Sequence, residues 1–318
     1  MNRRTPLAGL ALAAALAAAP LAARAEWQPK GPITMMIAFT AGGAADTQAR
    51  LVAEELETRK GWKVVPEAVL GKGGGVLAAR LAKQPADGTA IGIVVSETLN
   101  YNMLAEKNPG YGEADFTYLT TTAGTEMGVI ARSSRGWKTL ADVAAAMKKG
   151  QAISFGAMSQ KLADGAYLLG KAQGVKYNIV NLKGGKAVLD AVVAGDVDIG
   201  WVAGLQARGV QSGDLVNLAS GETTRLKLSP DAPTVKELGL DADFGVYFMF
   251  IAPKGLSAEA RDALTGAIKD IVNDPRSKTH AFIAKTLGAP ETISGAALDK
   301  TMADSLVAAK ALLDAASK

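Results

Sequence analysis

Short runs rich in β-branched residues alternate with alanine-rich amphipathic stretches along most of this chain, and this alternation limits its fold more than any other feature. Residues 33–39 are predicted to form a buried strand, and residues 47–59 place apolar side chains at helical spacing. A strand at 62–69, a helix at 76–83 and a strand at 90–95 follow. Strands and helices in strict alternation with short connections predict a parallel α/β sheet.

The same alternation starts again further along the chain. Strands are predicted at 127–131, 152–156, 177–182, 197–202, 215–220 and 246–252, with helices at 140–148, 162–173, 187–194, 258–273, 276–286 and 295–316. Two α/β blocks followed by a helical return segment predict two lobes.

The chain is expected to cross between these lobes near residues 130–132 and again near residues 250–252. Lobe one then comprises residues 26–130 plus 252–318, and lobe two comprises residues 131–251. Two α/β lobes joined by two crossings favour a cleft that closes around a ligand by hinge motion.

The first 25 residues have the three-part layout of a secretory signal peptide. A basic start at Asn2–Arg4 precedes an apolar run from Leu7 to Leu21, and Ala23–Ala25 is a small-x-small exit. The apolar run is shorter than the roughly 20 residues needed to span a bilayer. We expect cleavage after Ala25 and a periplasmic mature protein.

Composition argues against several function classes. The chain has no cysteine and one histidine, His280, in a predicted helix, so thiol nucleophiles and histidine metal pairs are excluded. The common serine-nucleophile signatures are absent from the mature chain. Removing Arg3, Arg4 and Arg24 lowers the net charge from +4 to +1, which gives no support to a nucleic-acid partner. We expect no enzymatic activity, metal or cofactor.

Small and polar residues gather where predicted strands pass into helices. In open α/β sheets ligands bind at the carboxyl ends of strands, where helix N-termini favour anions. The stretch Gly71–Gly75 is a poor nucleotide motif because Val76 breaks the glycine spacing. For Asp46 a helix-capping role is favoured over ligand contact. The candidate loops are 39–47, 71–75, 156–161, 182–186 and, as a fifth, 96–102.

Several motifs, in this order and spacing, resemble the TctC/Bug family, the extracytoplasmic solute-binding proteins of tripartite tricarboxylate transporters. The resemblance runs from about Pro32 to the C-terminus. The stretch Ala38–Asp46 is similar to the family's Pro-Phe-x-x-Gly-Gly-x-x-Asp loop. The other similar segments are Gly71–Gly74, Lys83–Thr89, Lys183–Gly184 with the following 187–202, and Asp231–Gly239.

This resemblance implies a two-lobe periplasmic binding protein fold of the type II kind, with a small carboxylate held in the cleft through main-chain amides and hydroxyls. It implies a monomer that delivers its ligand to the membrane subunits of a transporter, without metal or cofactor. Carried over residue by residue, it assigns ligand binding to Thr40, Gly42, Gly43, Ala44, Gly73, Gly74, Ser96, Thr98, Asn102, Ser159, Lys161, Lys183 and Gly184.

Departures from the family pattern suggest a ligand class. Lys161 adds a positive charge near the second-lobe loop, and Trp201–Val202 replaces a frequent Phe-Asp pair. Trp201 either closes over the ligand or packs in the core. A cleft with a gained lysine and a lost acid favours a dicarboxylate or tricarboxylate, or an aromatic acid stacked on Trp201.

Two other functions remain open at this point. A periplasmic enzyme on the same scaffold would use Asp46 and Glu97 as acid and base. A ligand sensor would present the closed form of the same cleft to a signalling receptor.

Overall fold

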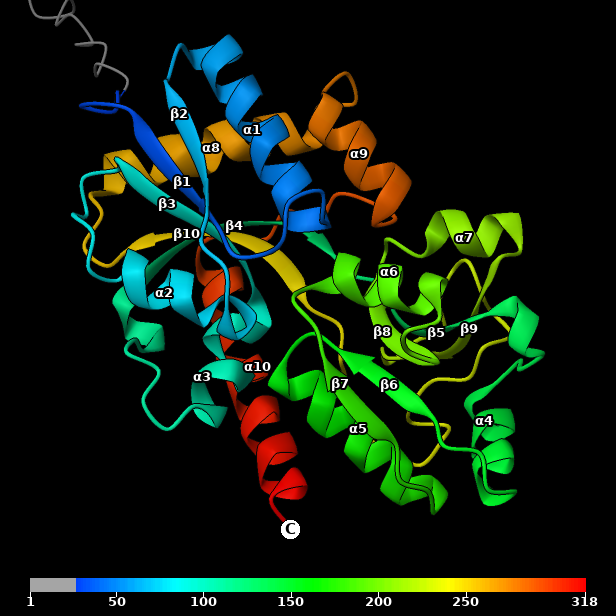
Figure 1. Cartoon of the computed structure of the whole chain (residues 1–318). Helices are drawn as coiled ribbons and strands as arrows, with labels where there is room; N and C mark the ends of the chain where they lie inside the picture. The colour runs from blue at the N-terminus through cyan, green and yellow to red at the C-terminus, as the bar shows by residue number, and fades with distance from the viewer. Residues whose placement is uncertain (1–26) are drawn as a thin grey trace, which may run out of the picture.

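Two five-stranded sheets, each in its own lobe, form the framework of the protein (Figure 1). The computed structural model describes residues 27–318. The expected signal peptide and its cleavage site after Ala25 lie outside the described residues. The α/β class and the two-lobe arrangement expected from the sequence are confirmed.

The first sheet has the strand order β2-β1-β3-β10-β4. β1 pairs in parallel with β2 and β3, whereas β10 runs antiparallel to both β3 and β4. The parallel arrangement expected for the strands at 33–39, 62–69 and 90–95 is therefore confirmed, and the antiparallel strands β10 and β4 extend this sheet. β10 begins beside the end of β3, with Phe248 opposite Val95, because the chain returns from the other lobe at that edge. The strands are β1 (Ile33–Ile37), β2 (Val64–Ala68), β3 (Ala90–Val95), β4 (Phe116–Gly124) and β10 (Tyr247–Pro253).

The second sheet repeats this plan with the order β7-β6-β8-β5-β9. β6 pairs in parallel with β7 and β8, and β5 runs antiparallel to β8 and β9. β5 enters next to the end of β8, with Met127 opposite Ala203. The strands are β5 (Met127–Arg132), β6 (Ser154–Ala157), β7 (Asn178–Asn181), β8 (Ile199–Ala203) and β9 (Leu215–Ser220).

The chain passes between the lobes at residues 125–126 and within the segment 221–246. All of β5 belongs to the second sheet and all of β10 to the first. The crossing points expected near 130–132 and 250–252 thus lie inside these two strands. Each expected crossing is a few residues late because the apolar run continues straight through the strand that follows the crossing.

Helices cover both sheets. In the first lobe these are α1 (Ala44–Lys60), α2 (Gly75–Leu81), α3 (Tyr101–Ala105), α8 (Ala258–Asn273) and α9 (Lys278–Thr286). In the second lobe they are α4 (Leu140–Lys148), α5 (Gln160–Gln173), α6 (Gly185–Ala194) and α7 (Ala207–Ser212). Sequence patterns missed β4, α3 and α7. β4 reads Phe-Thr-Tyr-Leu-Thr-Thr-Thr-Ala-Gly, and its buried threonines give no apolar run.

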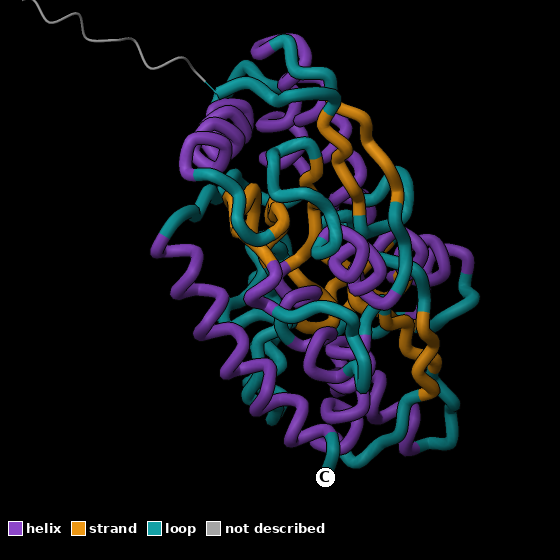
Figure 2. The backbone as a smooth tube through the Cα atoms, turned by 90° about the vertical axis from the view of Figure 1, so that its left-hand side faces the viewer, coloured by secondary structure: helices purple, strands orange, loops and turns teal. Residues whose placement is uncertain are grey.

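The C-terminal helix α10 (Ala296–Ala316) belongs to both lobes. Its first half packs Leu298 and Met302 into the first lobe, and its second half packs Ala309 and Leu312 into the core of the second. In Figure 1 it is the red helix that descends beside α5, and in Figure 2 it runs along one side of the molecule to the C-terminus. The end of the chain therefore extends beyond the lobe to which its sequence was assigned.

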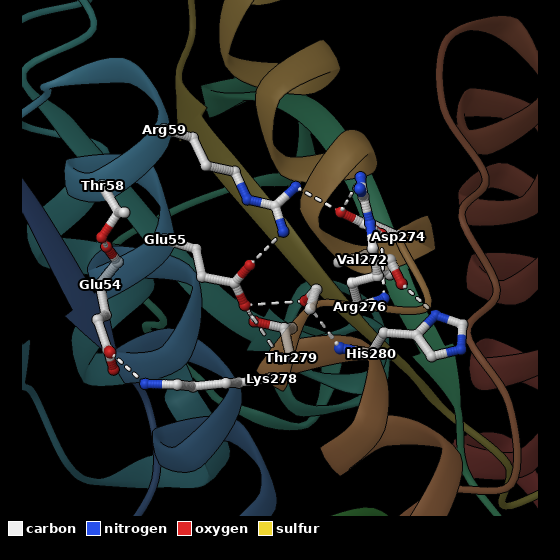
Figure 3. A network of polar contacts seen from close by, with 11 residues as sticks. Glu54, Glu55, Thr58, Arg59, Val272, Asp274, Arg276, Lys278, Thr279 and His280 are labelled. Carbon is white, nitrogen blue, oxygen red and sulfur yellow. Dashed lines mark hydrogen bonds and ion pairs between the residues drawn. The ribbon is translucent and has the colours of Figure 1, made fainter.

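A polar network fastens α9 to α1 (Figure 3). Oε1 of the buried Glu55 accepts hydrogen bonds from the Ser277 hydroxyl and from the amide and hydroxyl of Thr279, and Arg59 reaches Oε2 at 2.6 Å. Burial raises the pKa of Glu55, but these hydrogen bonds and Arg59 together outweigh burial, so the pKa lies below its ordinary value. Glu55 therefore contributes stability as an ionised group.

His280 lies in α9, as expected, and is partly exposed. Its Nδ1 lies 3.0 Å from the Val272 carbonyl oxygen, at the edge of the α1–α9 network (Figure 3). Within residues 27–318, none of the helices has the length and apolar character needed to cross a bilayer.

Candidate functional site

Two adjoining pockets form one cleft between the lobes. The first lobe contributes the loops after β1 and β2, and the second lobe contributes the loops after β6 and β7. The pocket that reaches Glu97, called the main pocket below, encloses about 630 Å³ of empty space counting its open mouth, and the adjoining outer pocket encloses about 840 Å³. Both pockets are lined by Phe39, Thr40, Gly73, Met158, Ser159 and Gly184.

Three helices of eight residues or more begin at this cleft. Gly43 and Ala44 at the start of α1 line it, as do Ser159 at the start of α5 and Gly184 at the start of α6. The N-cap residues of α1 and α6 are glycines, which have no side chain to cap the helix. The first amides of a helix have no intrahelical partner, so α1 and α6 direct unsatisfied N–H groups and positive dipole ends towards the cleft.

Asp46 organises the first of these helix starts. Its Oδ2 accepts a hydrogen bond from the Gly42 amide at 2.9 Å, and its Oδ1 lies 2.9 Å from Nε of Arg50. The N-cap is Gly43, so Asp46 stands in the first turn and acts on the residue before the cap. The Gly42 amide is already hydrogen-bonded to Asp46, and Gly42 does not line the cleft. The expectation that Asp46 itself caps the helix was therefore wrong: the carboxylate lies inside the first turn and stabilises the loop that precedes the Gly43 cap.

The glycine-rich loop is held in place by two residues that sequence reasoning had assigned to the ligand. Thr98 donates to the Gly73 carbonyl at 2.7 Å, and Asn102 donates to the same oxygen at 3.2 Å. Gly73 has φ +58°, and a Cβ there would lie 2.4 Å from Nδ2 of Asn102. Gly74 has φ +96°, and its Cβ would lie 2.5 Å from the Thr98 hydroxyl. Gly73 and Asn102 line the cleft. Gly74 and Thr98 line neither pocket, so they stabilise the conformation of the loop without reaching the cleft.

The two lobes touch each other across the cleft. The Thr40 hydroxyl donates to the Lys183 carbonyl at 2.5 Å, and the Tyr101 hydroxyl donates to Oδ2 of Asp164 at 2.6 Å. Lys183 lines the outer pocket. Ser96 is engaged elsewhere, since its hydroxyl accepts from the Tyr247 amide at the start of β10. Ser96 lines neither pocket of the cleft.

Trp201 is a core residue. Its side chain is fully buried, and Nε1 donates to the Leu162 carbonyl at 2.9 Å. Its ring lies between Phe155 and Phe244, at centroid distances of 5.6 and 4.9 Å. It lines neither pocket of the cleft, so of the two interpretations left open the structure shows core packing. A ligand in the cleft has no direct access to this ring.

Lys161 also faces away from the cleft. It is 8% exposed, its Nζ lies 5.6 Å from the centre of the Phe244 ring, and it lines a separate cavity behind the cleft. Burial lowers the pKa of Lys161, and the nearby charges of Glu97 and Asp243 oppose that shift. The expectation that Lys161 makes the cleft cationic does not match its position.

Glu97, not Lys161, is the ionisable residue of these two that lines the main pocket. It follows β3, is 3% exposed and lines the pocket. Burial raises the pKa of Glu97, while Lys161 and hydrogen bonds from the Ser159 and Asn102 side chains act in the opposite direction. Sequence reasoning considered Glu97 only as an acid or base, because nothing in its local pattern reveals the lysine that faces it from the other lobe.

Most of the cleft wall is apolar, and sequence patterns did not single out these residues. The wall side chains belong to ordinary strand ends and loops, so they looked like core. They are Phe39, Val95, Met127, Met158, Leu162, Leu205, Val246 and Phe248. Within residues 27–318 the acidic residues and His280 form no group of three that could hold a metal ion.

Two α/β lobes with helix N-termini directed into a shared cleft define the class of periplasmic solute-binding proteins. The family model described as tripartite tricarboxylate transporter family receptor, TctC, matches residues 48–316. This chain belongs to that family.

Comparison with individual proteins agrees with this assignment. A UPF0065 protein of Agrobacterium vitis is 30% identical over 257 residues, covering 78% of this chain and 73% of that protein. The structure of the periplasmic binding protein BugD superposes with a TM-score of 0.78 at 25% identity, covering 91% and 99% of the two chains. R. palustris Rpa4515 with adipate shares the fold, with a TM-score of 0.79 at 21% identity and coverage of 92% and 99%.

Proposed function

We propose that this protein captures a small organic carboxylate in the cleft and delivers it to the membrane subunits of a tripartite transporter. The observation that carries this proposal is the meeting of the α1, α5 and α6 N-termini, from both lobes, at one cleft. Main-chain amides and helix dipoles stabilise an anion without any metal or cofactor. The residues proposed to bind the carboxylate are Thr40, Gly43, Ala44, Gly73, Ser159 and Gly184, with Asn102 and Lys183 at the outer end of the cleft.

Closure of the two lobes is the proposed mechanism. A ligand that contacts Gly43 in lobe one and Gly184 in lobe two favours the closed state through its differential affinity. The Thr40–Lys183 and Tyr101–Asp164 hydrogen bonds add to that preference, since each joins the two lobes.

A thermal-shift screen of residues 26–318 tests this function. The panel contains monocarboxylates, dicarboxylates, tricarboxylates, aromatic acids, amino acids and sugars. We expect one class of carboxylate to raise Tm in a concentration-dependent way, because a ligand that binds only the native state stabilises it by mass action. A response to sugars alone, or to none of the carboxylates, contradicts the proposal.

A further inference from the structure

The charges around the cleft are distributed unevenly. Of the described residues that line the main pocket, Glu97 and Lys186 are the acidic and the basic one. Lys186 is exposed on the first turn of α6 and is paired with Asp190 at 2.6 Å. Glu97 is buried at the floor. A ligand that enters the pocket therefore meets a carboxylate at its inner end.

The basic partner of Glu97 does not share the pocket. Lys161 approaches from α5 in the second lobe and lies on the far side, in the cavity that also includes Asn100 and Asp243. Burial nevertheless raises the pKa of Glu97, so the inner end of the pocket disfavours negative charge even on its own carboxyl group, and Lys161 does not offset this from within the pocket.

The inner part of the pocket is unsuited to a second negative group. Its inner walls are formed by Val95, Leu162, Val246 and Phe248, which have no hydrogen-bond donors in their side chains. A ligand carboxylate placed among them would lose its hydration and face Glu97 at short range. Burying an uncompensated charge is costly, and like charges in a low dielectric repel each other strongly.

We propose that Glu97 selects the ligand class: a monocarboxylate whose apolar body carries a hydroxyl or amino donor that bonds to Glu97, and not a dicarboxylate or tricarboxylate. This inference rests on the proposed function, in which the helix N-termini at the mouth hold the one carboxylate. It replaces the doubly charged ligand expected from the sequence, because the lysine that suggested it lies behind Glu97.

A matched series of six-carbon acids tests this selection by isothermal titration calorimetry. Hexanoate, 6-hydroxyhexanoate, 6-aminohexanoate and adipate share one chain length and differ only in the group that reaches the inner end. A second series uses benzoate, 4-hydroxybenzoate, 4-aminobenzoate and terephthalate. We expect the hydroxy or amino member of at least one series to bind at least about tenfold more tightly than its dicarboxylate, since like-charge juxtaposition costs several kcal/mol.

Glu97→Gln replaces the carboxyl group with an amide of the same shape that does not ionise. We expect this variant to lose the discrimination against the dicarboxylate, with a change of at least about tenfold in the affinity ratio. Because Lys161 would remain buried without its partner, the double variant Glu97→Gln/Lys161→Met provides the same test with both charges removed. Glu55→Gln serves as the matched control, since it alters a buried carboxylate in the α1–α9 network, far from the cleft, and should lower stability without changing the ratio.

The outcomes separate this inference from the function on which it rests. The selection by Glu97 is overturned if the dicarboxylate is the tightest ligand of the wild type. It is also overturned if the affinity ratio in both Glu97 variants equals that of the wild type. In either case the carboxylate-binding function stands. If no member of either series binds and the broader carboxylate screen is also silent, both proposals fail together.

Discussion

Thr40 of the first lobe and Lys183 of the second are joined by a hydrogen bond from the threonine hydroxyl to the lysine carbonyl, at 2.5 Å. The two residues are 143 positions apart in the chain and meet at the mouth of the cleft. Because this bond joins the two lobes, an opening of the cleft would break it. It therefore reports on closure as well as on ligand contact.

Replacing Thr40 with valine removes the hydroxyl and keeps the shape. We expect ligand affinity to fall by about 2- to 10-fold, corresponding to the 0.5–1.5 kcal/mol of a typical hydrogen bond. Calorimetric titration with the best ligand of the screen measures this. Thr58→Val is the matched control, because the Thr58 hydroxyl bonds to Glu54 on the exposed side of α1. Equal affinities for Thr40→Val and the wild type would argue against a role for this contact in closure.

Gly73→Ala is expected to damage the cleft more than a glycine substitution elsewhere. A left-handed conformation costs a non-glycine residue about 1–2 kcal/mol, and here the new Cβ would also collide with Asn102. Both stability and ligand affinity should fall. Gly61→Ala separates the two effects, since Gly61 has φ +68° and its Cβ would meet nothing within 4 Å. That variant should lose stability alone, as measured by urea unfolding and titration. A Gly73→Ala protein that binds normally would refute the assigned geometry of the loop.

Glu222 makes stability depend on pH in a specific window. Its pKa is raised to about 7 from an ordinary value of 4.5. Burial is the largest cause, the charges of Asp243 and Glu126 act in the same direction, and the hydrogen bond from the Met127 amide opposes them. Between these two pH values the folded protein binds more protons than the unfolded chain at this site. The contribution of Glu222 to stability therefore decreases as pH rises from about 4.5 to about 7, by at most about 1.4 kcal/mol per pH unit.

Glu222→Gln isolates that contribution, because glutamine still offers an oxygen to Met127 and does not titrate. Urea unfolding of both proteins at pH 5, 6, 7 and 8 should show the variant gaining stability relative to the wild type as pH rises. Parallel curves for the two proteins would mean that Glu222 keeps an ordinary pKa in the folded state.

Trp201→Phe distinguishes a core residue from a ligand contact. The change leaves a gap between Phe155 and Phe244 and removes the donor to the Leu162 carbonyl. We expect a loss of stability smaller than the about 3–5 kcal/mol of a full truncation to alanine. Ligand affinity at a temperature well below Tm should be unchanged. A selective loss of binding to aromatic acids, at wild-type stability, would restore the ligand-stacking role.

Sequence patterns located most of the secondary structure and the loops that form the cleft. Small and polar residues at the carboxyl ends of strands are a local signal that gave these loops, and the resemblance to the TctC/Bug family singled out within them Thr40, Gly43, Gly73, Ser159 and Gly184, which line the main pocket. The same reasoning misplaced Thr98 and Lys161. A polar side chain that supports a loop and one that binds a ligand have the same local pattern, and only their neighbours in space tell them apart.

The missed strand β4 shows a similar limit. In the sequence its threonines look like part of a surface loop. In the structure Thr121 donates to the Glu291 carbonyl and Thr122 donates to Gln48 in the interior. Partners that lie 170 and 74 positions away satisfy these hydroxyls, so burial is possible without an apolar run.

The sequence by itself determined the α/β class, the division into two lobes and the helix starts at the cleft, because each follows from periodicity and local turn chemistry. The tertiary structure alone decided which ionisable residue lines the main pocket of the cleft. Glu97 and Lys161 come from different lobes, and the pocket receives the acid because the lysine reaches it from behind. Electrostatic character depends on distances and burial between segments far apart in the chain, and no local pattern contains them.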